Sequence, residues 1–80
     1  MIDLFISEHC PYCKKVMDFA KENDIKYNKV GIENPDNVLK LLTLGGMDQV
    51  PFLYNSEDNT RMYESDDIIE YLRNNFTGKK

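Results

Sequence analysis

The chain begins with a short apolar segment and a longer amphipathic one. Residues 2–6 (IDLFI) form an apolar run rich in β-formers, and its brevity favours a buried strand over a helix. Residues 11–24 then carry Val16, Met17 and Ala20 at helical spacing, with lysines and acids on the opposite face. The pattern therefore predicts a strand followed by a helix that starts at residue 11.

The middle of the chain predicts a second strand and a second helix. Residues 25–30 alternate apolar and polar side chains, which is the period of a strand, and Gly31 breaks the run. The segment NPDNVLKLLTLGG that follows carries helix signals at both ends. These signals are an N-cap at Asn34, a proline and an acid in the first turn at Pro35 and Asp36, and a stop at Gly45 or Gly46.

The last third of the chain predicts a hairpin and a closing helix. Residues 51–54 and 61–63 are strand-like runs, separated by the polar six-residue segment NSEDNT. Ser65 is then expected to be the N-cap of a helix that ends near Gly78. The first turn of this helix carries Asp66 and Asp67, and its apolar stripe consists of Ile68, Ile69, Leu72 and Phe76.

The predicted order of elements is β-α-β-α-β-β-α, within one domain that spans residues 1–80. A right-handed crossover makes the first two strands parallel, and the hairpin makes the last two antiparallel. We therefore predict an α/β fold, in which a four-stranded mixed sheet is covered by helices on both faces.

Composition narrows the class of protein. The chain is 41% hydrophobic and 30% charged, as in a folded soluble domain, and it has no apolar run near the roughly 18 residues of a membrane span. Its N-terminus lacks the features of a secretory signal, so we expect a cytoplasmic protein. A net charge of −4 argues against nucleic acid and anionic membrane surfaces as partners.

The motif HCPYC, residues 9–13, holds both cysteines and the single histidine. Cys10 precedes Pro11 at the predicted N-cap of the first helix, where free N–H groups and the helix dipole favour a thiolate. Cys13 follows within the first turn, close enough to form a disulfide with Cys10. We therefore predict that Cys10 is the attacking thiol and that Cys13 is its resolving partner.

Three simpler interpretations of the motif compete with this one. A structural zinc needs four ligands, and His9, Cys10 and Cys13 supply at most three, so no metal is expected. A structural disulfide is disfavoured because the loop is short and the cytosol is reducing. Inert core cysteines would suit a more apolar setting than Ser7-Glu8-His9. The histidine is either a polar loop residue or, when protonated, a group that favours the neighbouring thiolate.

The motif Cys-Pro-Tyr-Cys after a first strand, a later Val-Pro dipeptide and an acidic helix start resemble a glutaredoxin of the thioredoxin fold. The resemblance spans the chain and implies a small enzyme that reduces protein disulfides and glutathione mixed disulfides. Glutathione is then the co-substrate, and no cofactor is tightly bound. We also expect a monomer.

The second half is also similar to the N-terminal domain of glutathione transferases, which shares this fold. The similarity lies in GGMDQVPFL and MYESDDIIEYL. A transferase adds a large helical domain and usually lacks the second cysteine, so we expect a free-standing glutaredoxin with transferase-like sequence.

The resemblance assigns glutathione-binding roles to particular residues. It implies a cis peptide bond before Pro51, which leaves the Val50 backbone open to pair with the glutathione peptide. It places the γ-glutamyl end at Ser65 and Asp66, where a helix N-terminus receives the carboxylate and an acid pairs with the ammonium. The expected binding residues are Tyr12, Gln49, Val50, Pro51, Glu64, Ser65 and Asp66.

Two departures from the family concern the source of electrons. Many glutaredoxins have a lysine where this chain has Ser7, and Asp48 lies in the segment before the Val-Pro dipeptide. Each lost exposed ion pair should weaken the binding of an anionic tripeptide by about 0.5 to 1 kcal/mol. A thioredoxin-like donor reduced by a flavoprotein reductase therefore stays an alternative, as does a glutathione-dependent iron–sulfur cluster module.

Overall fold

The computed structural model describes residues 2–77, and its elements follow the predicted order. They are β1 (Ile2–Ile6), α1 (Pro11–Glu22), β2 (Asn28–Gly31), α2 (Pro35–Gly45), β3 (Phe52–Asn55), β4 (Thr60–Tyr63) and α3 (Ser65–Phe76). The strands form one sheet in the order β2-β1-β3-β4. β1 and β2 run parallel, whereas β3 is antiparallel to both of its neighbours. The predicted four-stranded mixed sheet is confirmed.

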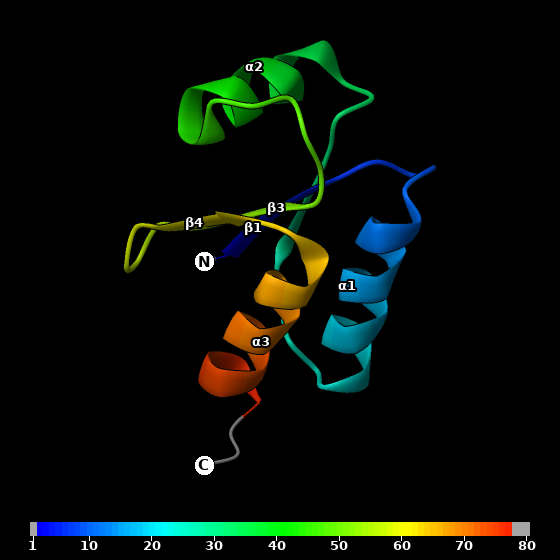
Figure 1. The fold of residues 1–80 in the computed structure, drawn as a ribbon, viewed down its shortest axis with the longest axis vertical. Coiled ribbons are helices and arrows are strands. Elements are labelled where there is room, and N and C mark those ends of the chain that lie inside the picture. The colour runs from blue at the N-terminus through cyan, green and yellow to red at the C-terminus, as the bar shows by residue number, and fades with distance from the viewer. Residues whose placement is uncertain (1, 78–80) are drawn as a thin grey trace.

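The sheet separates two layers of helices, as Figure 1 shows: α1 and α3 lie side by side on one face, and α2 lies on the other. Side chains alternate along β1, so Leu4 packs toward α1 and α3 while Phe5 packs toward α2. β3 repeats this with Leu53 and Phe52. The prediction of helices on both faces is therefore confirmed, and each face has its own apolar core.

The second strand begins later than its sequence pattern predicts. The alternating run started at Ile25, but β2 starts at Asn28 and includes Gly31. Ile25 instead closes α1: its N–H donates to the Ala20 carbonyl at 2.9 Å, and Asp24 adopts a positive φ of 54°. This is a Schellman-type helix end, in which an apolar residue packs back on the helix it follows. The apolar residue belonged to a helix terminus and not to a strand.

Local signals placed α2 correctly and α3 less well. The Asn34 side chain caps α2 by accepting from the Asp36 N–H at 3.0 Å, and Gly46 ends the helix in the left-handed conformation. The prediction of Ser65 as N-cap is wrong, because Ser65 is the first helical residue and Glu64 occupies the cap. α3 ends at Phe76, and the predicted end at Gly78 lies outside the described residues.

The β3–β4 hairpin is tighter than predicted. Asn55 extends β3 and Thr60 begins β4, so four residues rather than six form the loop. The Asn55 side chain stabilises this turn by accepting from the Glu57 N–H at 3.0 Å. Within residues 2–77 no helix is long and apolar enough to cross a membrane.

Candidate functional site

Cys10 lies where β1 delivers the chain to the start of α1. It is the N-cap residue of α1, as predicted, with Pro11 in the first helical position. Its Sγ accepts from the Cys13 N–H at 3.2 Å, and its own N–H donates to the Ser7 carbonyl at 3.2 Å. The Cys10 side chain is partly exposed. An accessible sulfur that already accepts a helix N–H is well placed to carry negative charge.

Cys13 has the opposite environment. Its side chain is fully buried in the core between the sheet, α1 and α3, and both cysteines are free thiols. Burial, followed by the hydrogen bond with Cys10, raises the pKa of the Cys13 thiol from 9.0 to about 12. Cys13 therefore stays protonated near neutral pH, and the two thiols are strongly unequal.

A carboxylate that the sequence did not identify supports the loop before Cys10. Glu33, between β2 and α2, accepts from the Ser7 hydroxyl and from the Glu8 N–H, both at 3.1 Å. The Glu8 N–H is the main cause that lowers the pKa of Glu33. Because β1 and β2 are parallel, the residues that follow them meet at one edge of the sheet, and this was the available signal.

His9 is exposed in this loop, with its N–H 3.4 Å from the Ser7 hydroxyl. Its positive form would lie near Glu33, since His9 contributes to the lowered pKa of that carboxyl. Ser7 stands where many glutaredoxins have a lysine, and its hydroxyl donates to the Glu33 carboxylate. Among residues 2–77 no group of three histidine, cysteine or acidic side chains could hold a metal ion.

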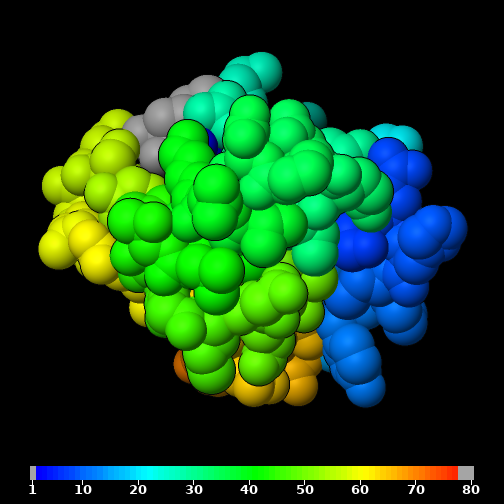
Figure 2. All heavy atoms as spheres, turned by 90° about the horizontal axis from the view of Figure 1, so that it is seen from above, coloured from blue at the N-terminus to red at the C-terminus, as the bar shows by residue number. Residues whose placement is uncertain are grey.

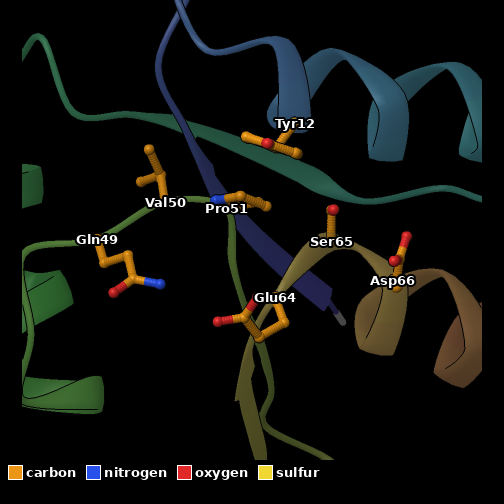
Figure 3. Close-up of a pocket in the computed structure, with 7 residues that line it drawn as sticks. All are labelled: Tyr12, Gln49, Val50, Pro51, Glu64, Ser65 and Asp66. Atoms are coloured by element: carbon orange, nitrogen blue, oxygen red, sulfur yellow. The ribbon is translucent and has the colours of Figure 1, made fainter.

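The seven residues assigned to glutathione binding line one pocket beside Cys10, of about 450 Å³. Figure 3 shows that they come from three places: the first turn of α1, the segment before β3, and the start of α3. The expected cis peptide bond between Val50 and Pro51 is present. The Val50 carbonyl lies 4.0 Å from the Cys10 sulfur, so the pocket opens next to the thiol.

The wall of the pocket at α3 contains an unusual residue pair. Ser65 is only 8% exposed, and its hydroxyl points into the pocket (Figure 3) without a hydrogen-bond partner among residues 2–77. Glu64 has a positive φ of 72° and makes no side-chain capping bond to α3. The first N–H groups of α3 are therefore left free beside the pocket. Asp66 pairs with Lys15 of α1 at 2.6 Å.

The segment between α2 and β3 is held by β4. The Tyr63 hydroxyl donates to the Met47 carbonyl at 2.8 Å and accepts from the Met47 N–H at 3.1 Å. The Arg61 guanidinium donates to the Leu44 carbonyl at 3.2 Å. In Figure 2 α2 (green) forms the near surface, with this yellow-green segment beside it. The hairpin thus fixes the chain that leads to the pocket.

Comparison with known proteins identifies the family. The profile of the glutathione S-transferase N-terminal domain matches residues 4–80. The chain therefore belongs to the glutathione S-transferase N-terminal domain family, whose thioredoxin-like fold the sheet and helices reproduce. No curated protein sequence matches the chain.

Solved structures agree with this fold. The thioredoxin-like protein BC3987 superposes with a TM-score of 0.78 at 21% identity, over 92% of this chain and 97% of that one. Human glutathione S-transferase T1-1 superposes with a TM-score of 0.77 at 23% identity, over 92% of this chain and 31% of that one. A glutathione S-transferase from Methylobacillus flagellatus KT, with glutathione bound, gives 0.76 at 27%, over 94% and 37%. The chain spans about a third of these transferases and nearly all of BC3987.

Proposed function

We propose that this protein is a glutaredoxin-type thiol–disulfide oxidoreductase that acts through Cys10 and Cys13. The observation that carries the proposal is the inequality of the two thiols. The Cys10 sulfur is accessible and accepts a helix N–H, whereas the Cys13 thiol is buried and has a raised pKa. Cys10 is suited to attack a disulfide, and Cys13 is suited to stay protonated until it resolves the mixed disulfide.

In the proposed reaction, the Cys10 thiolate attacks one sulfur of a substrate disulfide. A mixed disulfide forms, and the other substrate sulfur leaves as a thiolate. The Cys13 sulfur then attacks the Cys10 sulfur, and its proton passes to the departing substrate thiolate, so that the reduced substrate is released and a Cys10–Cys13 disulfide remains. Two external thiols, such as two molecules of glutathione, restore the dithiol and become glutathione disulfide.

Glutathione is the proposed co-substrate, and the pocket beside Cys10 is its proposed site. Two bacterial transferases of related fold were crystallised with glutathione bound. In the proposed pose the Val50 backbone pairs with the peptide, and the free N–H groups of α3 receive the γ-glutamyl carboxylate. Glu64 and Asp66 lie beside that position and would attract its ammonium. We propose a monomeric cytoplasmic enzyme that serves glutathione mixed disulfides and protein disulfides.

The test is the reduction of a glutathione mixed disulfide by the wild-type protein, Cys10→Ser and Cys13→Ser. We expect Cys10→Ser to lose at least about a thousandfold in rate, while Cys13→Ser keeps activity on the mixed disulfide and loses it on a protein disulfide. Equal activity of both variants would overturn the assignment of Cys10. Glutathione alone, compared with NADPH and a flavoprotein reductase, identifies the reductant.

The family match favours a second candidate function, the conjugation of glutathione to electrophiles. A conjugating enzyme activates the thiol of glutathione and needs no resolving cysteine. Conjugation to 1-chloro-2,4-dinitrobenzene that survives in the Cys10→Ser, Cys13→Ser double variant would favour this candidate. Loss of all thiol chemistry in the double variant favours the oxidoreductase.

A further inference from the structure

The charges on the pocket wall are of one sign. The seven lining residues include the carboxylates of Glu64 and Asp66 but no lysine, arginine or histidine. The loop on the Cys10 side adds Glu8, and the segment on the Val50 side adds Asp48, both exposed. The lining of the pocket therefore carries negative charge with no cation of its own to balance it.

The two lysines in the first turns of α1, close along the chain to the lining residue Tyr12, are already paired. Lys15 lies 2.6 Å from Asp66, and Lys14 lies 2.8 Å from Asp18. These pairs are exposed, so each holds its lysine weakly. The structure describes all of α1. Because of these two pairs, the first turns of this helix offer no unpaired cation to a ligand carboxylate.

Glu64 is the carboxylate without compensation. Its side chain makes no hydrogen bond and no ion pair within residues 2–77, and its positive φ is a conformation that L-residues rarely adopt. Figure 3 shows its carboxylate turned toward the Gln49 side of the pocket, away from the first turn of α3. The backbone therefore presents this negative charge to the ligand and not to the helix.

The pocket itself has the features of a ligand site. Its volume of about 450 Å³ falls within the usual range for small-molecule sites. Ser65 is 8% exposed as a residue, and its hydroxyl points into the pocket without a partner among the described residues. The hydroxyl therefore stays accessible from the pocket, where it can exchange water for a polar group of a ligand.

From this arrangement we infer that the pocket selects disulfides that carry a positive charge within a few atoms of the reacting sulfur. The inference rests on the proposed function and adds the class of substrate. A substrate ammonium or guanidinium group lies beside Glu64 and exchanges with Lys15 at Asp66, while the substrate sulfur reaches Cys10. An anionic group beside Glu64 is repelled by that carboxylate, which slows formation of the mixed disulfide.

A single-turnover experiment tests this without any second substrate. The reduced protein is mixed with one of three small disulfides: cystamine, a dication; bis(2-hydroxyethyl) disulfide, which is neutral; or 3,3′-dithiodipropionate, a dianion. The rate of appearance of the Cys10–Cys13 disulfide is measured and divided by the rate for dithiothreitol, a small uncharged thiol, with the same disulfide. This correction removes the intrinsic reactivity of each disulfide.

We expect the corrected rate for cystamine to exceed that for the dianion by about tenfold at low salt, and to fall toward equality near 0.5 M salt. The Glu64→Gln, Asp66→Asn double variant should lose most of this ratio, and Glu64→Lys should reverse its order. Glu70→Gln is the matched control, because Glu70 is an exposed acid on α3 outside the pocket. This control should keep the wild-type ratio.

Equal corrected rates for the three disulfides in the wild-type protein overturn the inference and leave the proposed function intact. A ratio that the double variant retains also overturns it, because the selection then lies outside the pocket. No reaction with any of the three overturns the proposed function as well. Two peptide disulfides, flanked by lysines or by glutamates, then show whether the preferred cation comes from a protein substrate or only from a small molecule.

Discussion

α1 and α3 both begin at the pocket, but they treat their first N–H groups differently. α1 is capped by its own cysteine, whose sulfur accepts the Cys13 N–H. α3 has Glu64 in the cap position with no capping bond, and its Ser65 hydroxyl is also unpaired within residues 2–77. α2, away from the pocket, has an ordinary asparagine cap at Asn34.

The difference separates two uses of a helix N-terminus. At α1 an N–H group is taken up by the protein itself, because the Cys13 N–H donates to the Cys10 sulfur. At α3 the N–H groups are left for a charge that a ligand brings. α3 therefore depends on its buried face for its position, whereas α1 also has a cap and Pro11 to fix its start.

The largest expected effect concerns the two thiols of α1. With iodoacetamide at pH 7, we expect Cys10 to be modified about a thousandfold faster than Cys13. A pKa raised to about 12 keeps the Cys13 thiolate scarce until the pH rises beyond 9 toward 12. Peptide mass mapping over time measures both sites. Comparable rates at pH 7 would contradict the inequality on which the proposed mechanism depends.

The dependence of α3 on packing gives the next largest effect. Ile68 is fully buried in α3, so Ile68→Ala should lower the free energy of unfolding by about 3 kcal/mol. Leu39 of α2, which is 65% exposed, supplies the control, and Leu39→Ala should change it by less than about 0.5 kcal/mol. Urea unfolding measures both. Similar losses would mean that α3 is not held by its buried face.

Substitution of the cap residue should raise protein stability at α3, whereas at an ordinary helix cap it lowers stability. Glu64→Gly relieves the positive φ and should stabilise the protein by about 0.5 to 1 kcal/mol. Asn34→Ala in α2 should destabilise it by about 1 kcal/mol, because a capping bond is lost. Glu64→Ala keeps the backbone conformation and serves as the control. Equal stability of Glu64→Gly and Glu64→Ala would show that no strain is present.

The smallest effect should come from Glu33, below the Cys10 loop. Glu33→Gln keeps an acceptor for Ser7 and Glu8 but removes a negative charge that helps to raise the pKa of the Cys13 thiol. Loss of that charge favours the thiolate form of the reduced protein, so the protein should become less reducing. We expect a twofold to fivefold change in its exchange equilibrium with glutathione, about 10 to 20 mV.

Quantitative alkylation in glutathione redox buffers measures this equilibrium. Glu22→Gln, at the far end of α1, is the control and should leave it unchanged. A shift toward a more reducing protein in Glu33→Gln would contradict the expected sign of the electrostatic effect.

The fold could be predicted where its signals are local. The ends of α2 are marked by Asn34, Pro35 and Gly46, each of which acts within a few residues along the chain. β2 was misplaced because the apolar Ile25 of a helix end imitates the first position of an alternating strand. The cap of α3 was misassigned because Ser65 is a typical capping residue, whereas Glu64 in a positive φ has no sequence signature.

In the site, too, the features set by neighbouring residues could be predicted, and those set by distant residues could not. Cys10 and Cys13 lie three residues apart, and a proline-led helix start makes their inequality predictable from the sequence. The Glu33 contact joins residues 26 apart, and the pair between Lys15 and Asp66 joins residues 51 apart. The parallel pairing of β1 and β2 could have brought Glu33 near Ser7 in a prediction, but the contact itself and the Lys15–Asp66 pair appear only once the sheet and helices are assembled.

Tyr63 holds the segment before the pocket through its bonds to Met47, and this restricts which residues position 45 can accept. A side chain at Gly45 would clash with the Tyr63 hydroxyl and lie 2.9 Å from the Phe52 ring. Gly45 therefore cannot gain a side chain while Tyr63 keeps its position. A directed-evolution library that aims to reshape the pocket for a new substrate should randomise both codons together, because single substitutions at residue 45 would be purged before their effect on specificity is seen.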